Sequence, residues 1–199
     1  MGLSPAEEAQ LLAQAGTGIL PVGMLTTAVT QPFAQTFDRR LATGAAYQTV
    51  SGTVVMTAIW LPAGKVITGI TFVSGATGET GGTNLWFALY KADLTLMAQS
   101  TNDTGPTSFG ANAGLRKALA TAQTLPYTGL YYLAYCSTNS AGTNPTLLSV
   151  NAAVASANGS IAGLTPIVAG TSSTGQTTTA PAPAAALTAI VQSIYAFVD

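Results

Sequence analysis

The stretch that decides the fold is TVVMTAIWLPAGKVITGITFVS, which spans residues 53–74. It is rich in β-branched and aromatic residues, which are favoured in strands. The segment Leu61–Gly64 reads as a type I turn, with proline in second place and glycine in fourth. We therefore expect one strand from Thr53 to Leu61 and another from Lys65 to Ser74.

Further strands are predicted at short spacing along the rest of the chain: Asn84 to Lys91, Leu94 to Gln99, Leu115 to Ala122, Gly129 to Ser137 and a closing strand at Ser193 to Val198. The apolar run in the first of these indicates burial on both faces. No amphipathic helix lies between these strands, although a parallel sheet would need helical crossovers. The pattern predicts a mainly β protein, an antiparallel β-sandwich.

The expected sandwich is jelly-roll-like, because a final strand returns after a long loop to pair across the molecule. That loop, Thr171 to Ala186, is a low-complexity run of Thr, Ser, Pro and Ala, and we expect it to be exposed. The sequence divides into a helix and arm at residues 1–44 and a β-sandwich domain at residues 45–199.

The N-terminal part predicts a short helix followed by an extended arm. Ser4 is a good N-cap, Glu7 completes a capping box, and Gly16 is placed to end the helix. So short a helix needs a partner surface to be stable in water. The arm either packs on its own domain or lies across a neighbouring subunit, and its candidate anchoring residues are Leu11, Leu12, Leu20, Leu25, Phe33, Phe37, Arg39 and Arg40.

Charge is scarce in this sequence. Its 199 residues include six Lys and Arg, seven Asp and Glu, no His and one Cys, so 7% are charged against about 25% in ordinary domains. From Ala118 to Val198 there is no charged residue at all. The absence of His excludes imidazole catalysis, and the few basic residues argue against nucleic-acid binding. We expect a non-enzymatic protein with no cofactor, no metal and no membrane span.

The remaining chemical candidates favour structural roles. Asp93 and Asp103 flank one predicted strand and could approach each other as a glycosidase pair, but both lie in turn-like sequence. Cys136 lies in an apolar strand, which is typical of a buried, inert thiol. The glycine-rich segment Gly75 to Gly82 lacks the Lys-Ser/Thr of a phosphate-binding loop and predicts a mobile hairpin.

Aromatic residues on the predicted strands leave three roles open. One set fills the core, because alternate strand residues face opposite sides of a sheet. The other set could form a subunit interface or an exposed platform for sugar rings. Trp86 and Tyr132 are the residues that we would assign to a glycan platform.

Several segments together resemble a known family. They are the run from Trp60 to Gly75, Leu85 to Tyr90, Thr128 to Ala134, Phe37 to Thr43 and Tyr195 to Val198. The resemblance is to β-sandwich domains of tailed bacteriophages that infect actinobacteria, in minor tail proteins, head fibres and capsid decoration proteins. It covers residues 37–199 and does not extend to the helix or to the arm before Phe37.

This resemblance implies a structural protein of the virion, made in the cytoplasm of the bacterial host. The expected role is a capsid decoration protein or head fibre that is anchored by its N-terminal arm to the major capsid protein or another virion protein. Self-association is expected, as a homotrimer, because an apolar, weakly charged chain must cover much of its surface. The alternative is a minor tail protein that binds a host receptor or cell-wall glycan.

Overall fold

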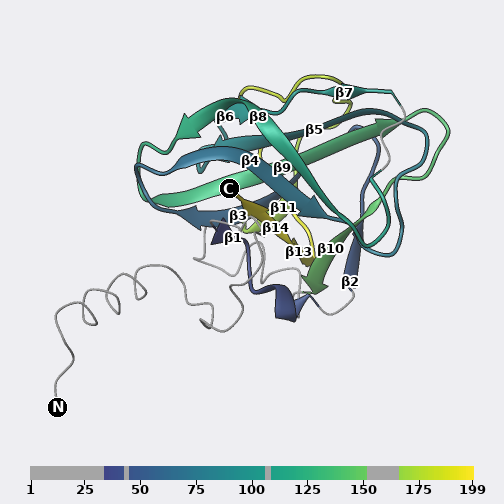
Figure 1. Cartoon of the computed structure of the whole chain (residues 1–199), viewed down its shortest axis with the longest axis horizontal. Helices are drawn as coiled ribbons and strands as arrows, with labels where there is room; N and C mark the ends of the chain where they lie inside the picture. Colours follow the sequence, from purple (N-terminus) through teal and green to yellow (C-terminus); the bar gives the residue numbers. More distant parts are fainter. Residues whose placement is uncertain (1–33, 43–44, 106–108, 152–165) are drawn as a thin grey trace, which may run out of the picture. The chain divides into compact units, whose positions relative to one another are not determined.

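A computed structural model describes residues 34–42, 45–105, 109–151 and 166–199, and these form a mainly β structure (Figure 1). The strands are β1 (Ala34–Gln35), β2 (Ala45–Gln48), β3 (Val55–Leu61), β4 (Val66–Val73), β5 (Gly82–Lys91), β6 (Leu96–Gln99), β7 (Asp103–Thr104), β8 (Gly114–Thr124), β9 (Gly129–Asn139), β10 (Thr146–Asn151), β11 (Ala169–Thr171), β12 (Thr188–Ala189), β13 (Gln192–Ile194) and β14 (Ala196–Val198). A 3₁₀ helix, η2, spans Arg39–Leu41. The predicted N-terminal helix lies outside the described residues.

The described strands form three sheets in which all pairs are antiparallel. The largest has the order β12-β11-β3-β9-β5-β6, with β7 also pairing with β5. A second has the order β1-β14-β4-β8, and a third the order β13-β10-β2. The prediction of an antiparallel β-sandwich is confirmed, because these sheets pack face to face around one apolar core.

Aromatic contacts join the largest sheet to the second one. Phe72 on β4 meets Phe87 on β5 edge to face, with ring centroids 4.9 Å apart, and Tyr135 on β9 at 5.7 Å. All three side chains are fully buried. Edge-to-face pairs of this kind add stability beyond the area that they bury. The third sheet closes the same core through Leu147 on β10 and Ile194 on β13.

Strand β5 confirms the expectation of burial on both faces. Every residue from Leu85 to Tyr90 has no exposed surface. The odd-numbered residues of this run face the core between the sheets, and the even-numbered ones belong to a second apolar cluster on the outer face of the largest sheet. A sheet that is apolar on both faces needs a cover on each.

The turn after β3 differs from the predicted type I turn. Gly64 has a positive φ of 76°, which suits the third place of a type II turn and favours glycine there. Its amide donates to the Leu125 carbonyl at 2.9 Å and does not close back on Leu61. The chain here crosses from one sheet to another, since β3 pairs with β9 while β4 pairs with β8.

The closing strand is split between two sheets. β13 pairs with β10, and after Tyr195 the chain continues as β14, which pairs with β4 and with β1. Residues 34–37, which we assigned to the arm, therefore pack on the β domain: β1 belongs to this sheet, and the Thr36 amide donates to the Ala196 carbonyl at 2.9 Å. The Phe37 ring, an expected anchor, meets the Tyr195 ring edge to face at 5.4 Å.

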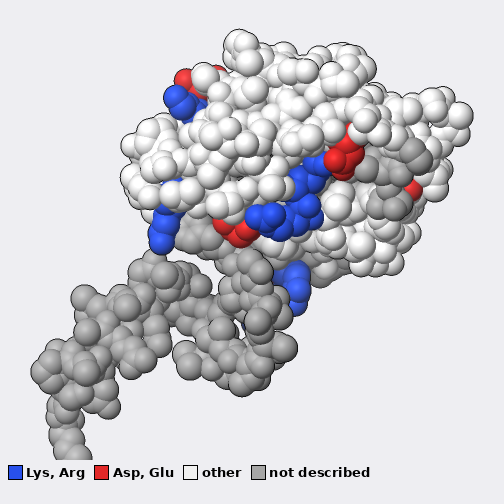
Figure 2. Space-filling model, turned by 45° about the horizontal axis from the view of Figure 1, so that its top comes forward, with Lys and Arg blue, Asp and Glu red and all other residues white. Residues whose placement is uncertain are grey.

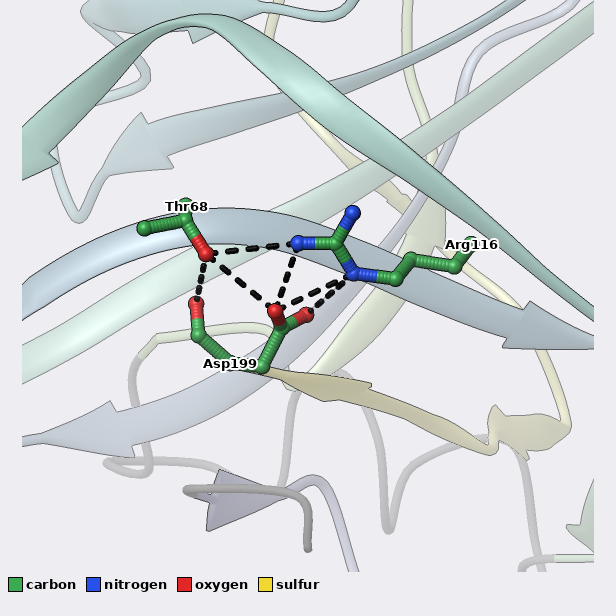
Figure 3. A network of polar contacts seen from close by, with 3 residues as sticks. All are labelled: Thr68, Arg116 and Asp199. Carbon is green, nitrogen blue, oxygen red and sulfur yellow. Dashed lines mark hydrogen bonds and ion pairs between the residues drawn. The ribbon is translucent and has the colours of Figure 1, made fainter. Parts of the chain in front are cut away.

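Asp199 ties the end of β14 to the middle of β4 (Figure 3). The Arg116 guanidinium donates to both carboxylate oxygens of Asp199, the shortest contact being 2.6 Å, and Thr68 donates to the same group. A Cβ at Gly69 would lie 2.6 Å from this guanidinium, so only glycine lets Arg116 cross β4 so closely. The pairing raises the pKa of Arg116.

We predict that Arg116→Ala lowers the free energy of unfolding by about 1 kcal/mol or less, because this pair is partly exposed to solvent. Urea denaturation at low and high salt measures the loss, which should shrink as salt screens the pair. Arg40→Ala is the matched control: Arg40 pairs with Asp38 and its side chain is 88% exposed, so its loss should leave stability unchanged. An equal loss of stability in both variants would show that the Arg116–Asp199 pair does not stabilise the fold.

Candidate interaction surface

The glycan platform predicted at Trp86 and Tyr132 is wrong, because both side chains are buried. Trp86 has no exposed surface and Tyr132 is 2% exposed. The Trp86 Nε1 donates to the Thr177 carbonyl at 2.9 Å, and the Tyr132 hydroxyl donates to the Ile167 carbonyl at 2.6 Å. Both acceptors belong to segments that lie far along the chain and cover this face of the largest sheet.

The cover is the segment 172–187, which we call the strap. It has no strand, as the low-complexity sequence predicts, but it is not simply an exposed loop. Ala180 is 3% exposed and Ala184 is 8% exposed, and both pack in the outer apolar cluster with Trp86 and Tyr90. Small alanine side chains let the strap lie close against these large rings.

Polar contacts hold the strap along the same face. The Tyr90 hydroxyl donates to the Pro181 carbonyl at 2.9 Å. The Gln99 amide group of β6 donates from Nε2 to the Thr178 carbonyl at 2.8 Å, and its Oε1 accepts from the Ala180 amide at 2.5 Å. One side chain therefore makes a paired contact with the strap backbone, as a neighbouring strand would.

We predict that Gln99→Ala loosens the strap and lowers the free energy of unfolding by about 1–3 kcal/mol, because two backbone groups lose their partners. Limited proteolysis should then cut within the strap at protease concentrations that leave the wild type intact. Gln123→Ala is the control, since its side chain bonds only to the nearby Thr121 carbonyl. Equal protection of both variants would show that Gln99 does not hold the strap.

Trp60 lies on the outer face but beyond the cover. It is 67% exposed, which is the largest exposure among the big apolar side chains of the described residues. Strand periodicity explains its direction: Ile59 and Leu61 point into the core, while Trp60 points to the side of Met56 and Ala58. An exposed tryptophan amid apolar neighbours is characteristic of an interaction surface.

A groove of about 290 Å³ opens beside Trp60, and we call it the Trp60 groove. Its walls come from the segment between β1 and η2, from β3, β9, β10 and β13, and from the residue before β11. They are formed by Thr36, Phe37, Thr57, Ala58, Ile59, Trp60, Leu130, Val150, Val168 and Ser193. No described residue in this lining is charged, so the groove favours an apolar partner over a charged one.

Beside the Trp60 groove, no described strand pairs with β3 at the edge where β11 ends. β11 pairs with β3 only over residues 55–57, and the last bond runs from the Ala58 amide to the Val168 carbonyl at 2.7 Å. Alternate residues of a strand direct their backbone groups to the same edge. The Trp60 backbone therefore faces this edge too, beyond the last residue that pairs there.

Charged residues are sparse on the described surface, and Asp38, Arg39 and Arg40 directly follow the groove residue Phe37. Figure 2 shows a few Lys, Arg, Asp and Glu side chains on an otherwise uncharged surface. Lys117 pairs with Asp103 at 2.5 Å, next to the pair of Arg116 with Asp199. Of the predicted anchoring residues, Arg39 and Arg40 are exposed, whereas Leu11, Leu12, Leu20, Leu25 and Phe33 lie outside the described residues.

The two candidate glycosidase carboxylates do not face each other. The Asp93 carboxylate accepts from the Thr95 amide at 2.9 Å, as a turn cap, while Asp103 is paired with Lys117. Asp103 lies opposite Leu85 on β5, and Asp93 follows the far end of that strand at Lys91. Six residues of strand span roughly 20 Å, which is too far for a shared sugar bond.

Other expected features can be placed on the described residues. Cys136 is fully buried, and burial raises the pKa of its thiol to about 12, in agreement with the predicted buried thiol. Within the described ranges, no three His, Cys, Asp or Glu side chains gather closely enough to hold a metal ion. Nor does any described helix have the length and hydropathy needed to cross a bilayer.

One residue with unusual chemistry escaped prediction. Glu79, in the glycine-rich segment, is only 4% exposed, and neither of its carboxyl oxygens has a hydrogen-bond partner. Burial raises its pKa from 4.5 to about 7, and the nearby Ser137 side chain opposes this rise. A lone glutamate among glycines is typical of a solvated loop, so the sequence contains no signal for this burial.

The chain was compared with protein-family models, with curated proteins and with solved structures, and none of the three comparisons finds a match.

Proposed function

We propose that this chain is a non-enzymatic structural protein of a bacteriophage particle, with capsid decoration protein or head fibre as its specific role. The observation that carries the proposal is the exposed Trp60 beside an apolar, uncharged groove. Such a surface suits lasting contact with another protein, because apolar burial is insensitive to salt. The resemblance in the segments around Trp60 supplies the biological setting.

Self-association fits the same surface. Interfaces between subunits concentrate their binding energy in a few aromatic residues, with tryptophan prominent among them. Trp60 is joined by Val168, which is 39% exposed, and by Leu130 in one wall. The proposed assembly is a homotrimer, and anchoring to the major capsid protein or another virion protein falls to the N-terminal helix and arm, residues 1–44.

The alternative role, a minor tail protein that binds a host glycan, loses its assigned residues. It rested on exposure of Trp86 and Tyr132, and both are covered by other segments. Sugar-binding platforms need an accessible ring face. The structural role of the chain is therefore favoured over glycan binding.

Quantitative mass spectrometry of purified particles tests the proposal. We expect hundreds of copies per particle for a decoration protein or head fibre, and only a handful for a protein of the tail tip. A chain that is abundant in infected cells but absent from purified particles would overturn a role in the virion.

A variant tests the surface itself. We predict that Trp60→Ser weakens self-association of the full chain at least tenfold, measured by sedimentation velocity over a range of concentrations, because a central aromatic residue is lost. Val50→Ser is the matched control, since Val50 is 57% exposed but does not line the groove. If both variants associate like the wild type, the Trp60 groove is not the interface.

A further inference from the structure

The segment Gly75–Gly81, which we call the glycine loop, is fastened to two neighbouring segments. It joins β4 to β5, and because these strands belong to different sheets it is not the hairpin that we predicted. The Glu79 amide donates to the Phe109 carbonyl at 2.8 Å. The Thr80 amide donates to the Thr143 carbonyl at 3.1 Å, and the Thr80 hydroxyl accepts from the Thr143 amide at 2.9 Å.

Close backbone approaches make these contacts depend on glycine. A Cβ at Gly78 would lie 2.8 Å from the Ala111 amide nitrogen, and one at Gly142 would lie 1.7 Å from the Thr80 carbonyl oxygen. Real Cβ atoms do not come so close to backbone atoms. The loop therefore lies directly on residues 109–113 and on the turn between β9 and β10, with no side chain between them.

Glu79 places a carboxyl group beneath this contact. The titratable groups close enough to sense its charge are Tyr135 and Cys136 on β9, both fully buried, of which Tyr135 packs in the core and Cys136 in the outer cluster. The Tyr135 hydroxyl donates to Ser137 at 2.8 Å. Residues 109–113 and 140–146 contain no ionisable side chain. No cation is at hand to balance a negative charge here, and an unpaired buried charge is strongly unfavourable.

We propose that the glycine loop is a pH-sensitive clasp, held most firmly while Glu79 is a neutral carboxylic acid and opening more often once the group is ionised. A carboxylate needs water, and water reaches this position only if the loop lifts from the segments beneath it. Release would uncover the end of β9 and the Thr143 turn, while the strands of the core stay paired.

The direction of the pH effect follows from linkage. The carboxyl binds its proton more tightly when the loop is closed, with a pKa of about 7, than in water, where it is 4.5. Closure is therefore strongest below pH 4.5 and weakens as pH rises toward 7. Between pH 5.5 and 8.5 these two values give a roughly 30-fold rise in the open fraction.

Hydrogen–deuterium exchange of the full-length protein at pH 5.5 and 8.5 tests this, with rates corrected for intrinsic exchange. We expect the protection of the Glu79 and Thr80 amides to fall about 30-fold at the higher pH, while amides in β5 and β9 keep theirs. Glu79→Gln, which is neutral at both pH values, should remove the difference. Asp93→Asn is the control, since Asp93 is an exposed acid, and it should behave like the wild type.

Two outcomes would overturn the clasp: equal protection of the wild-type loop at both pH values, or the same loss in Glu79→Gln. If that variant does not fold, a ¹³C NMR titration of the wild-type glutamate carboxyls decides the question. Titration of every glutamate near pH 4.5 contradicts the clasp, and a resonance that titrates near pH 7 supports it if the loop's amide protection falls over the same pH range. Neither result depends on the proposed virion role.

Discussion

The constraint on which the rest of the structure depends is the burial of β5 and β9 on both faces. Their odd-numbered and even-numbered residues belong to two separate apolar clusters, one on each face of the largest sheet. Each face must therefore be shielded from water by another part of the chain. The other two sheets cover one face through contacts such as Phe72 with Phe87. The described residues form no further sheet over the second face, and the strap covers it instead.

The strap shows how a sequence of Thr, Ser, Pro and Ala can serve as a structural layer. It buries little surface of its own, but it supplies backbone carbonyls where Trp86 and Tyr90 need acceptors. Buried polar groups are costly unless they are bonded, so these contacts keep the aromatic layer in place. Where the strap and β11 end, Trp60 remains exposed, and the proposed interface follows directly from the limits of that cover.

Sparse charge gives individual ionisable groups unusual weight. Asp199 and Asp103 each have a basic partner, and Asp93 caps a turn. Glu79 differs from these acids because it is enclosed and no described basic group acts on it. Because burial raises the pKa of the Glu79 carboxyl, its protonation and the closure of the glycine loop depend on each other in the proposed clasp.

The sequence by itself predicted β3, β4, β5, β6, β8 and β9, their antiparallel arrangement and the burial of β5, because period-two patterning and apolar runs are local signals, but it did not indicate β2, β10 or β11. It also predicted the buried Cys136. The predictions of an exposed glycan platform at Trp86 and Tyr132, and of a mobile hairpin around Glu79, were wrong. Which aromatic ring stays exposed, and which carboxyl is enclosed, was decided by the tertiary structure alone, because segments distant in the chain supply the covering atoms.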